Sequence, residues 1–428
     1  MSSSSNQSRA CKEYNSLSRR SFLKSTAATA AAVAVPSWIP QVAYAQSHES
    51  NRDILISVFL RGGADGMTLC VPHGEARYYQ LRPDIAVPPP NSGHVKRARD
   101  LDGFFGLPYG FYALEPAYRA GHLAFVHAVG SDNWSRSHFD AQRWMENCGR
   151  DINLNSGWLA RHLASSSEMV AGTPLRGLSM TYGMVRTLNG GPKSLPIADP
   201  DNFDYYSYLP DFQEVSDTTF QNYVAANDYC RPSVENTKRT IELLESLDVA
   251  NYHGAGGAVY GDNGFGYSMK ASAALIKANL GVEAIHIDID GWDTHNQQGA
   301  VDGYMEQLML ELGTNVAAFH EDMNASGRMD FTLVVMSEFG RNAGQNDTIG
   351  TDHGAGSSMF VMGGGVNGNH VYGQWPGLTN LLDNQDLYAT TDYRSVLAEI
   401  VSKRLQNGAN LGTVFPDFSP NDLGVFHA

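Results

Sequence analysis

Short apolar runs rich in β-branched residues recur along the chain. Most are apolar on both faces, which is typical of strands in a parallel sheet that helices cover on each side. The predicted strands are residues 54–60, 123–129, 283–289, 331–337 and 358–362.

Between these runs, apolar residues return every three or four positions, the spacing of one face of a helix. This pattern predicts helices around residues 269–280 and 305–319, and a last amphipathic helix from Tyr393. Strands that alternate with helices predict an α/β fold with a mostly parallel central sheet and helices on both faces.

Two stretches interrupt the alternation. Residues 84–110 carry three consecutive prolines, and residues 185–262 are rich in Tyr, Asn, Asp and Pro, with one helix-like piece at 235–247. Both are predicted to be insertions above the sheet. Because no repeat and no linker is recognisable, we expect residues 46–428 to form a single domain.

The first 45 residues resemble a cleaved export signal. Paired arginines at positions 19 and 20 lead into a small-residue apolar stretch at 25–35 and then Ala43-Tyr44-Ala45, an A-x-A cleavage signature. The apolar stretch is shorter than the roughly 20 residues that span a bilayer. We therefore predict a twin-arginine signal peptide, the twin-arginine export machinery as a partner, and a periplasmic or secreted mature protein.

Composition narrows the class of protein further. Of 428 residues, 42% are hydrophobic and 18% charged, as in globular chains, and 30 Lys and Arg against 45 Asp and Glu give a net charge of −15. Loss of residues 1–45 removes five basic residues and one acid, so the mature chain is still more acidic. We expect no nucleic-acid partner, and no integral membrane segment after signal cleavage.

Three cysteines remain after cleavage, Cys70, Cys148 and Cys230, each about 80 residues from the next. Three buried apolar cysteines are the favoured interpretation, since free Cys is among the most buried residue types. One disulfide with a spare thiol is the alternative.

Polar residues collect in loops that follow predicted strands, where open α/β sheets bind their ligands. The first such loop holds Asp65 between glycines, as a ligand or as a turn aspartate that caps the next segment. The second holds Arg136, Ser137 and His138 at the start of a predicted helix. Ser137 is there either a nucleophile or, with Asp140, a helix cap.

The later loops carry residues that bind metals. Asp293 and His295 stand two apart after one strand, and they suit a divalent metal or form a hydrogen-bonded pair. Glu338 directly follows another buried strand, which is costly unless Arg341 or a metal pairs with it. A further acid and histidine lie between glycines at Asp352 and His353.

Together these segments resemble a large family of exported bacterial proteins of unknown function that is grouped with the alkaline phosphatase and sulfatase superfamily. The segments that carry the resemblance are the export signal, residues 60–66, 137–140, 291–295, 337–341 and 351–354. The resemblance implies an alkaline-phosphatase-like sheet with loop insertions over the active-site edge.

By chain order the resemblance also implies roles for single residues. Ser137 would be the nucleophile, with Ser135 as the alternative, and His138 and Arg136 are the other catalytic candidates. The implied metal ligands are Asp65, Asp293, His295, Glu338, Asp352 and His353. The implied cofactor is a divalent metal ion: zinc, manganese, magnesium or calcium.

Three features depart from the superfamily's pattern. Phe339 stands after Glu338 where a histidine is usual, the spacing from Asp293 to His295 is short, and the sulfatase C-x-P-x-R motif is missing. One of two metal sites is therefore lost or rebuilt, and sulfatase chemistry through formylglycine is not expected.

The sequence thus favours an exported metal-dependent hydrolase of phosphate- or sulfate-type esters, with an anionic ester as substrate. The alternative is a non-catalytic binding or structural protein of the cell envelope on a degenerate phosphatase-like fold. That alternative draws on Phe339 and on an aromatic insertion with Tyr205, Tyr206, Tyr208 and Tyr223.

Overall fold

A computed structural model describes residues 52–131, 135–149, 151, 153–203, 218, 221–222 and 231–427. Contacts divide the chain into two compact units, 48–198 with 253–428, and 199–252 with 1–47. The signal segment, Cys230 and the four tyrosines of the aromatic insertion lie outside the described residues. A single domain over 46–428 stays a prediction.

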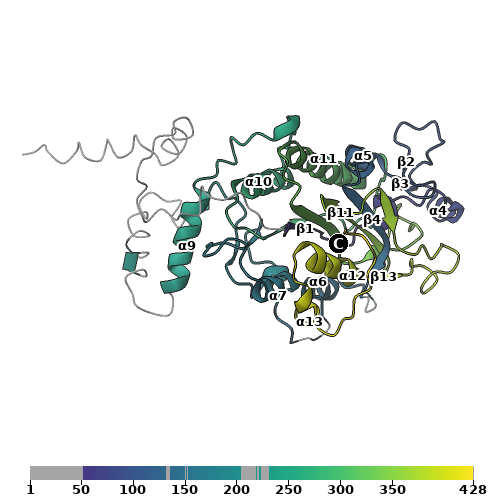
Figure 1. Cartoon of the computed structure of the whole chain (residues 1–428). Coiled ribbons are helices and arrows are strands. Elements are labelled where there is room, and N and C mark those ends of the chain that lie inside the picture. The colour runs from purple at the N-terminus through teal and green to yellow at the C-terminus, as the bar shows by residue number, and fades with distance from the viewer. Residues whose placement is uncertain are drawn as a thin grey trace, which may run out of the picture. The chain divides into compact units, whose positions relative to one another are not determined.

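The larger unit is built on a mixed, mostly parallel sheet with the order β12-β4-β11-β8-β1-β7-β5-β6, to which β13 adds by pairing with β4 (Figure 1). Its strands are β1 (Ile54–Leu60), β4 (Leu123–Gly130), β5 (Gly177–Ser179), β6 (Ser194–Pro196), β7 (Ala284–Ile289), β8 (Phe331–Ser337), β11 (Ser357–Gly363), β12 (His370–Tyr372) and β13 (Thr391–Asp392). All five predicted strands are confirmed to within one residue at each end. Within the sheet β11 is antiparallel to both of its neighbours.

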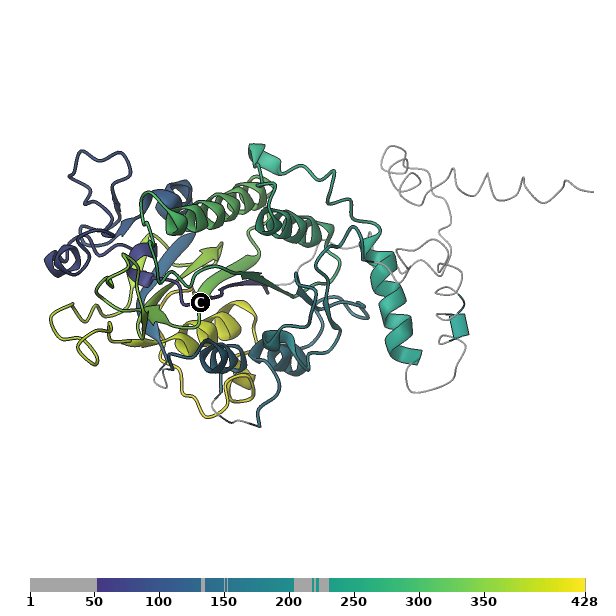
Figure 2. The same cartoon turned by 180° about the vertical axis from the view of Figure 1, so that it is seen from behind.

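Helices cover both faces of this sheet, as the sequence predicted (Figures 1 and 2). α10 (Gly264–Ala278) and α11 (Tyr304–Ala325) lie on one face. On the other lie α6 (His138–Asn147), α7 (Trp158–Ser165), α12 (Tyr393–Glu399) and α13 (Leu411–Val414). A π-helical turn, Ile400–Arg404, continues α12.

Each of the two interruptions contains regular structure. Residues 84–110 include the two-stranded sheet of β2 (Arg99–Asp100) and β3 (Gly106–Leu107), with Val87 and Ala98 in a small hydrophobic cluster. In the smaller unit the predicted helix is α9 (Arg231–Leu244), which buries Ile241 and Leu244. The remaining short α-helices and strands of the described residues are α3 (Gly66–Leu69), α4 (Ala76–Leu81), α5 (Glu115–Arg119), β9 (Gly340–Arg341) and β10 (His353–Gly354).

Cys70 and Cys148 are free and buried, as predicted. Burial raises the pKa of the Cys148 thiol to about 12. Both are therefore protonated apolar side chains at neutral pH.

Register brings the candidate loops to one edge of the sheet. Leu60 at the end of β1 pairs with Ile289 at the end of β7 and with Ser337 at the end of β8. Because β11 runs the other way, its first residue, Ser357, lies at this edge as well and pairs with Val129. The loops that begin after β1, β4, β7 and β8, and the loop that ends at β11, therefore meet at one place.

Candidate functional site

Four side chains converge at this edge of the sheet: His138 from the start of α6, Asp293 and His295 from the loop after β7, and His353 from β10. One potential ligand atom from each of His138, Asp293 and His353 lies within 4.8 Å of the other two. His295 Nε2 lies 2.9 Å from His353 Nε2 and 3.0 Å from Asp293 Oδ1. His138 Nε2 approaches Asp293 Oδ2 at 3.4 Å. We call these four residues the histidine cluster.

Close approach of the loops depends on a glycine and an arginine. Gly62 has φ of 124°, and a Cβ built there would lie 2.5 Å from the backbone nitrogen of Asp293. The buried Arg341 guanidinium donates to four backbone carbonyls, those of Gly62, Gly63, Trp292 and Thr351, and at 2.6 Å to Asp293 Oδ1. These contacts fix the loop after β7 against the loop after β1.

Each histidine of the cluster has a hydrogen-bond acceptor next to its Nδ1 atom, and this contact fixes the orientation of the ring. His138 Nδ1 lies 2.9 Å from Glu338 Oε1, His295 Nδ1 2.8 Å from Asp352 Oδ1, and His353 Nδ1 2.8 Å from the Arg136 carbonyl. Ionised carboxylates and carbonyls only accept, so each Nδ1 carries the proton. In the neutral imidazoles the lone pair is then on Nε2, directed into the cluster, which is the arrangement of metal-bound histidines.

This arrangement places hydrogen-bond acceptors, the Nε2 atoms and the Asp293 carboxylate, opposite one another. Two Nε2 atoms stand 2.9 Å apart, with Asp293 Oδ1 beside them. The His138 Nε2 atom is buried without a hydrogen bond among the described residues. Desolvation opposes ionisation of Asp293, but the hydrogen bond from Arg341 and the positive charge of that guanidinium outweigh it, and the pKa of Asp293 falls to about 2. A shared proton or a cation is needed to satisfy these atoms.

Glu338 lies behind the cluster, one hydrogen bond from its centre. Its Oε1 atom accepts from the Gly62 backbone at 2.8 Å, from His138, and from Gln142 at 2.9 Å. Burial acts to raise the pKa of this carboxyl, but the hydrogen bonds from His138 and Gln142 leave it below its usual value. Arg341, its expected partner, binds Asp293 instead. The structure thus places Glu338 where it orients His138 through Nδ1.

Asp65 is at the N-cap of α3 and outside the cluster. Its oxygens accept from Arg82 at 2.5 and 3.0 Å, and from Thr68 and Gln298 at 2.7 Å each. The carboxylate is almost fully buried and both oxygens are used. Its side chain does not cap the helix.

The loop before α6 presents its polar groups in unexpected ways. Ser137 is the N-cap residue of α6, but its hydroxyl makes no cap hydrogen bond, so the predicted pairing with Asp140 does not form the helix cap. Its backbone N–H donates to Ser135 Oγ at 3.1 Å. Arg136 directs its guanidinium to Asp386 at 2.8 Å and to the His353 backbone carbonyl at 3.2 Å, and its own carbonyl lies 2.8 Å from His353 Nδ1. Residues 132–134 of this loop lie outside the described residues.

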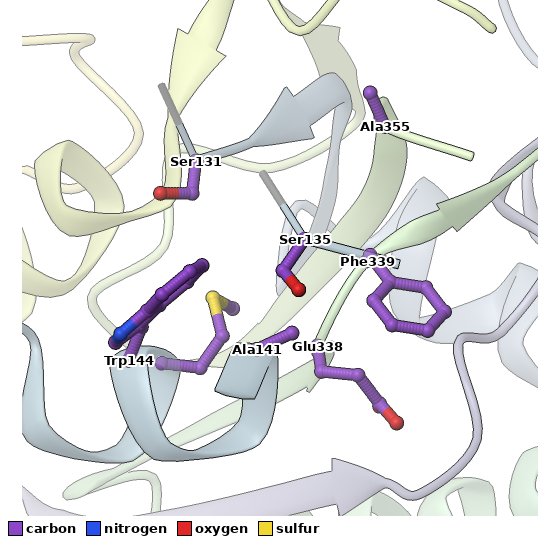
Figure 3. Close-up of a pocket in the computed structure, with 8 residues that line it drawn as sticks. Ser131, Ser135, Ala141, Trp144, Glu338, Phe339 and Ala355 are labelled. Carbon is purple, nitrogen blue, oxygen red and sulfur yellow. The ribbon is translucent and has the colours of Figure 1, made fainter. Parts of the chain in front are cut away.

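A small hollow of about 10 Å³, room for about one water molecule, lies next to Glu338 and Phe339 (Figure 3). Ser131, Ser135, Trp144, Glu338, Phe339 and Ala355 line it. Phe339 is buried, with its ring centroid 5.0 Å from that of His138 and 4.8 Å from that of His353. Phe339 therefore packs against two imidazoles of the cluster.

Asn346 is a positioning residue that the sequence did not reveal. Its Nδ2 donates to the His295 carbonyl at 2.9 Å and to Asp352 Oδ1 at 3.1 Å. Asp352 thus stands behind His295, in the way that Glu338 stands behind His138. The only sequence signal for Asn346 was its place in a glycine-rich loop shortly before Asp352.

Comparison with known sequences identifies two regions. Residues 16–36 match the twin-arginine translocation (TAT) pathway signal sequence. The protein is exported. Its location is therefore the periplasm or beyond, and the twin-arginine machinery is its export partner, as predicted.

Residues 217–399 match a family described as "Protein of unknown function (DUF1501)". This range contains Asp293, His295, Glu338 and His353. It also spans the strands β7, β8 and β10. No curated protein matches the chain. In the described part of the chain, no helix has the length and apolar character needed to cross a membrane.

Proposed function

We propose that this protein is an exported metal-dependent hydrolase of phosphate- or sulfate-type esters on an alkaline-phosphatase-like sheet. His138, Asp293 and His353 would hold one divalent metal, with His295 as a further ligand. The observation that carries the proposal is the orientation of the three imidazoles, with Nδ1 bound from outside and Nε2 directed at Asp293.

The donor set narrows the choice of metal. Three imidazole nitrogens and one carboxylate suit zinc, with manganese as the second choice. Magnesium and calcium prefer oxygen ligands and fit this set poorly. Asp65, Glu338 and Asp352 are not proposed as ligands: both Asp65 oxygens accept from Arg82, and Glu338 and Asp352 accept from the Nδ1 atoms of His138 and His295 instead.

A divalent metal at this position supplies Lewis acidity toward an ester oxygen. Glu338 and Asp352 hold the His138 and His295 rings in the tautomer that accepts at Nε2. Arg341 keeps Asp293 ionised and fixed. The nucleophile is the Ser137 hydroxyl at the start of α6, the nearby Ser135 hydroxyl, or water, and Ser→Ala variants at both positions distinguish these three.

Metal analysis by mass spectrometry of the exported, folded protein tests this proposal. We expect about one zinc or manganese per chain, lost in Asp293→Ala and in His353→Ala, and turnover of p-nitrophenyl phosphate or sulfate lost with it. His370→Ala, at an exposed histidine of β12, is the matched control and should keep its metal.

Wild-type protein without metal, purified without chelators, would contradict the metal centre and favour the non-catalytic envelope protein. Metal retained by both variants would place the ion elsewhere.

A further inference from the structure

Resting on the function proposed above, we infer that the metal-loaded centre selects esters with one negative charge over esters with two. Phosphodiesters and sulfate monoesters belong to the first class, and phosphate monoesters at neutral pH to the second. The charges of the described residues around the histidine cluster carry this inference.

The inner shell is acidic. Asp293, Glu338 and Asp352 each contact an imidazole of the cluster, and Arg341 is the cation that contacts Asp293. Three negative charges against one positive leave an excess of two negative charges when the histidines are neutral ligands. One divalent cation therefore only neutralises the centre.

The next shell adds no surplus of positive charge. Arg136 is 2.8 Å from Asp386 and 3.8 Å from Asp383. Arg61 is shared between Glu146 at 3.0 Å and Asp288 at 2.8 Å. Each of these two cations thus faces two carboxylates.

Two more cations, Arg82 and Arg143, lie near the site. Arg82 is paired with the buried Asp65. Arg143 lies five residues beyond His138 on α6, about 7.5 Å along the helix axis, and Asp140 lies nearer to the helix start on the same helix. Arg143 forms no ion pair with a described residue, but it is a single cation, so the described part of the site holds no group of cations that could balance a second charge on the substrate.

A second negative charge on an ester would add to a centre that the metal has only brought to neutrality. At separations of several ångströms and an effective dielectric constant of about 20, one uncompensated charge changes binding by roughly tenfold, which is about 1.4 kcal/mol. Charge balance is thus large enough to decide between the two classes of ester.

Calorimetric binding to the zinc-loaded exported protein tests this inference without requiring turnover. Dimethyl phosphate is a monoanion, and methyl phosphate is a dianion at about pH 8, above its second pKa of about 6. We expect dimethyl phosphate to bind at least about fivefold more tightly. Equal or tighter binding of methyl phosphate would overturn the inference, and so would binding of neither.

Metal content of the same sample separates the two proposals. If the sample holds zinc and the preference is absent, only the charge selectivity fails. If the sample holds no zinc, the proposed function fails first.

Asp352→Asn sharpens the test, because it removes one negative charge and keeps an amide oxygen that can accept from His295 Nδ1. We expect the ratio of methyl phosphate to dimethyl phosphate affinity to rise by roughly threefold to tenfold. Asp330→Asn is the control: Asp330 precedes β8 at the opposite edge of the sheet, roughly 25 Å from Glu338 at about 3.3 Å per residue. A ratio that Asp352→Asn leaves unchanged, in protein that keeps its zinc, would contradict the inference.

Discussion

Asp65 and Asp293 both follow strands at the same edge of the sheet, yet their surroundings differ in kind. Asp65 is 1% exposed and is surrounded by donors: Arg82, Thr68 and Gln298. The Asp293 side chain is 45% exposed and faces imidazole Nε2 atoms that the outer hydrogen bonds turn into acceptors. Asp65 has donors at both oxygens and is already satisfied, whereas Asp293 accepts from Arg341 at Oδ1 and otherwise faces acceptors that a cation would satisfy. The chemistry of the partners therefore separates a structural acid from a candidate ligand.

Removal of Asp65 gives the largest effect that this comparison predicts. Asp65→Ala leaves the buried Arg82 guanidinium without its counter-charge, and we expect the free energy of unfolding to fall by about 3–5 kcal/mol. Urea unfolding measures this loss, and metal per folded chain should stay the same. Loss of metal from a folded Asp65→Ala variant would contradict the conclusion that Asp65 is a structural acid and not a ligand.

Low pH should lower the stability of the fold through two buried histidines, His127 and His162. Burial lowers the pKa of His127 to about 4 and of His162 to about 3. The unfolded chain takes up these protons from about pH 6.5 downward, so stability is full above that pH and falls as the pH is lowered toward the folded pKa values. Each histidine should cost about 2 kcal/mol by pH 5, and His162→Gln should flatten the slope of unfolding free energy against pH. An unchanged slope would contradict the burial argument.

Glu338→Gln tests a buried acid that contacts His138 but is not itself proposed as a metal ligand. The amide still accepts from His138, but the charge behind the ring is lost, and we expect metal affinity to fall by about 10- to 100-fold. Competition with a fluorescent chelator measures the constant. Complete loss of metal with normal folding would instead indicate that Glu338 is a direct ligand, and unchanged affinity would deny it any role.

The smallest effect concerns Asp293 in metal-free protein. Because Arg341 keeps its backbone carbonyl partners, Asp293→Ala should change the unfolding free energy in chelator by less than about 1 kcal/mol. Wild-type protein alone should gain stability when zinc is added. Thermal unfolding with and without zinc checks both statements, and an equal gain in the variant would contradict them.

Much of the fold could be predicted from the sequence because its strands are apolar on both faces. β1 and β8 occur over the predicted residues, and the edge where their loops meet followed from parallel pairing. The antiparallel direction of β11 was not predicted, because an apolar run has no direction.

The candidate site could be predicted only in part, since its partners are distant in sequence. Asp293, His295 and His353 were identified as metal-binding types, and the structure brings them together. The sequence could not reveal that Glu338 contacts His138 across 200 residues. It also could not show that Arg82, 17 residues beyond Asp65, occupies that carboxylate. Such pairings depend on tertiary packing, and no local pattern encodes them.

Anomalous X-ray scattering at the zinc edge, from crystals of the exported protein, tests the central claim most directly. We predict one peak among His138 Nε2, His353 Nε2 and Asp293, with His295 next to it, and no peak at Asp65. A protein crystallised with zinc that shows no peak in the histidine cluster, or shows one only elsewhere, would contradict the account.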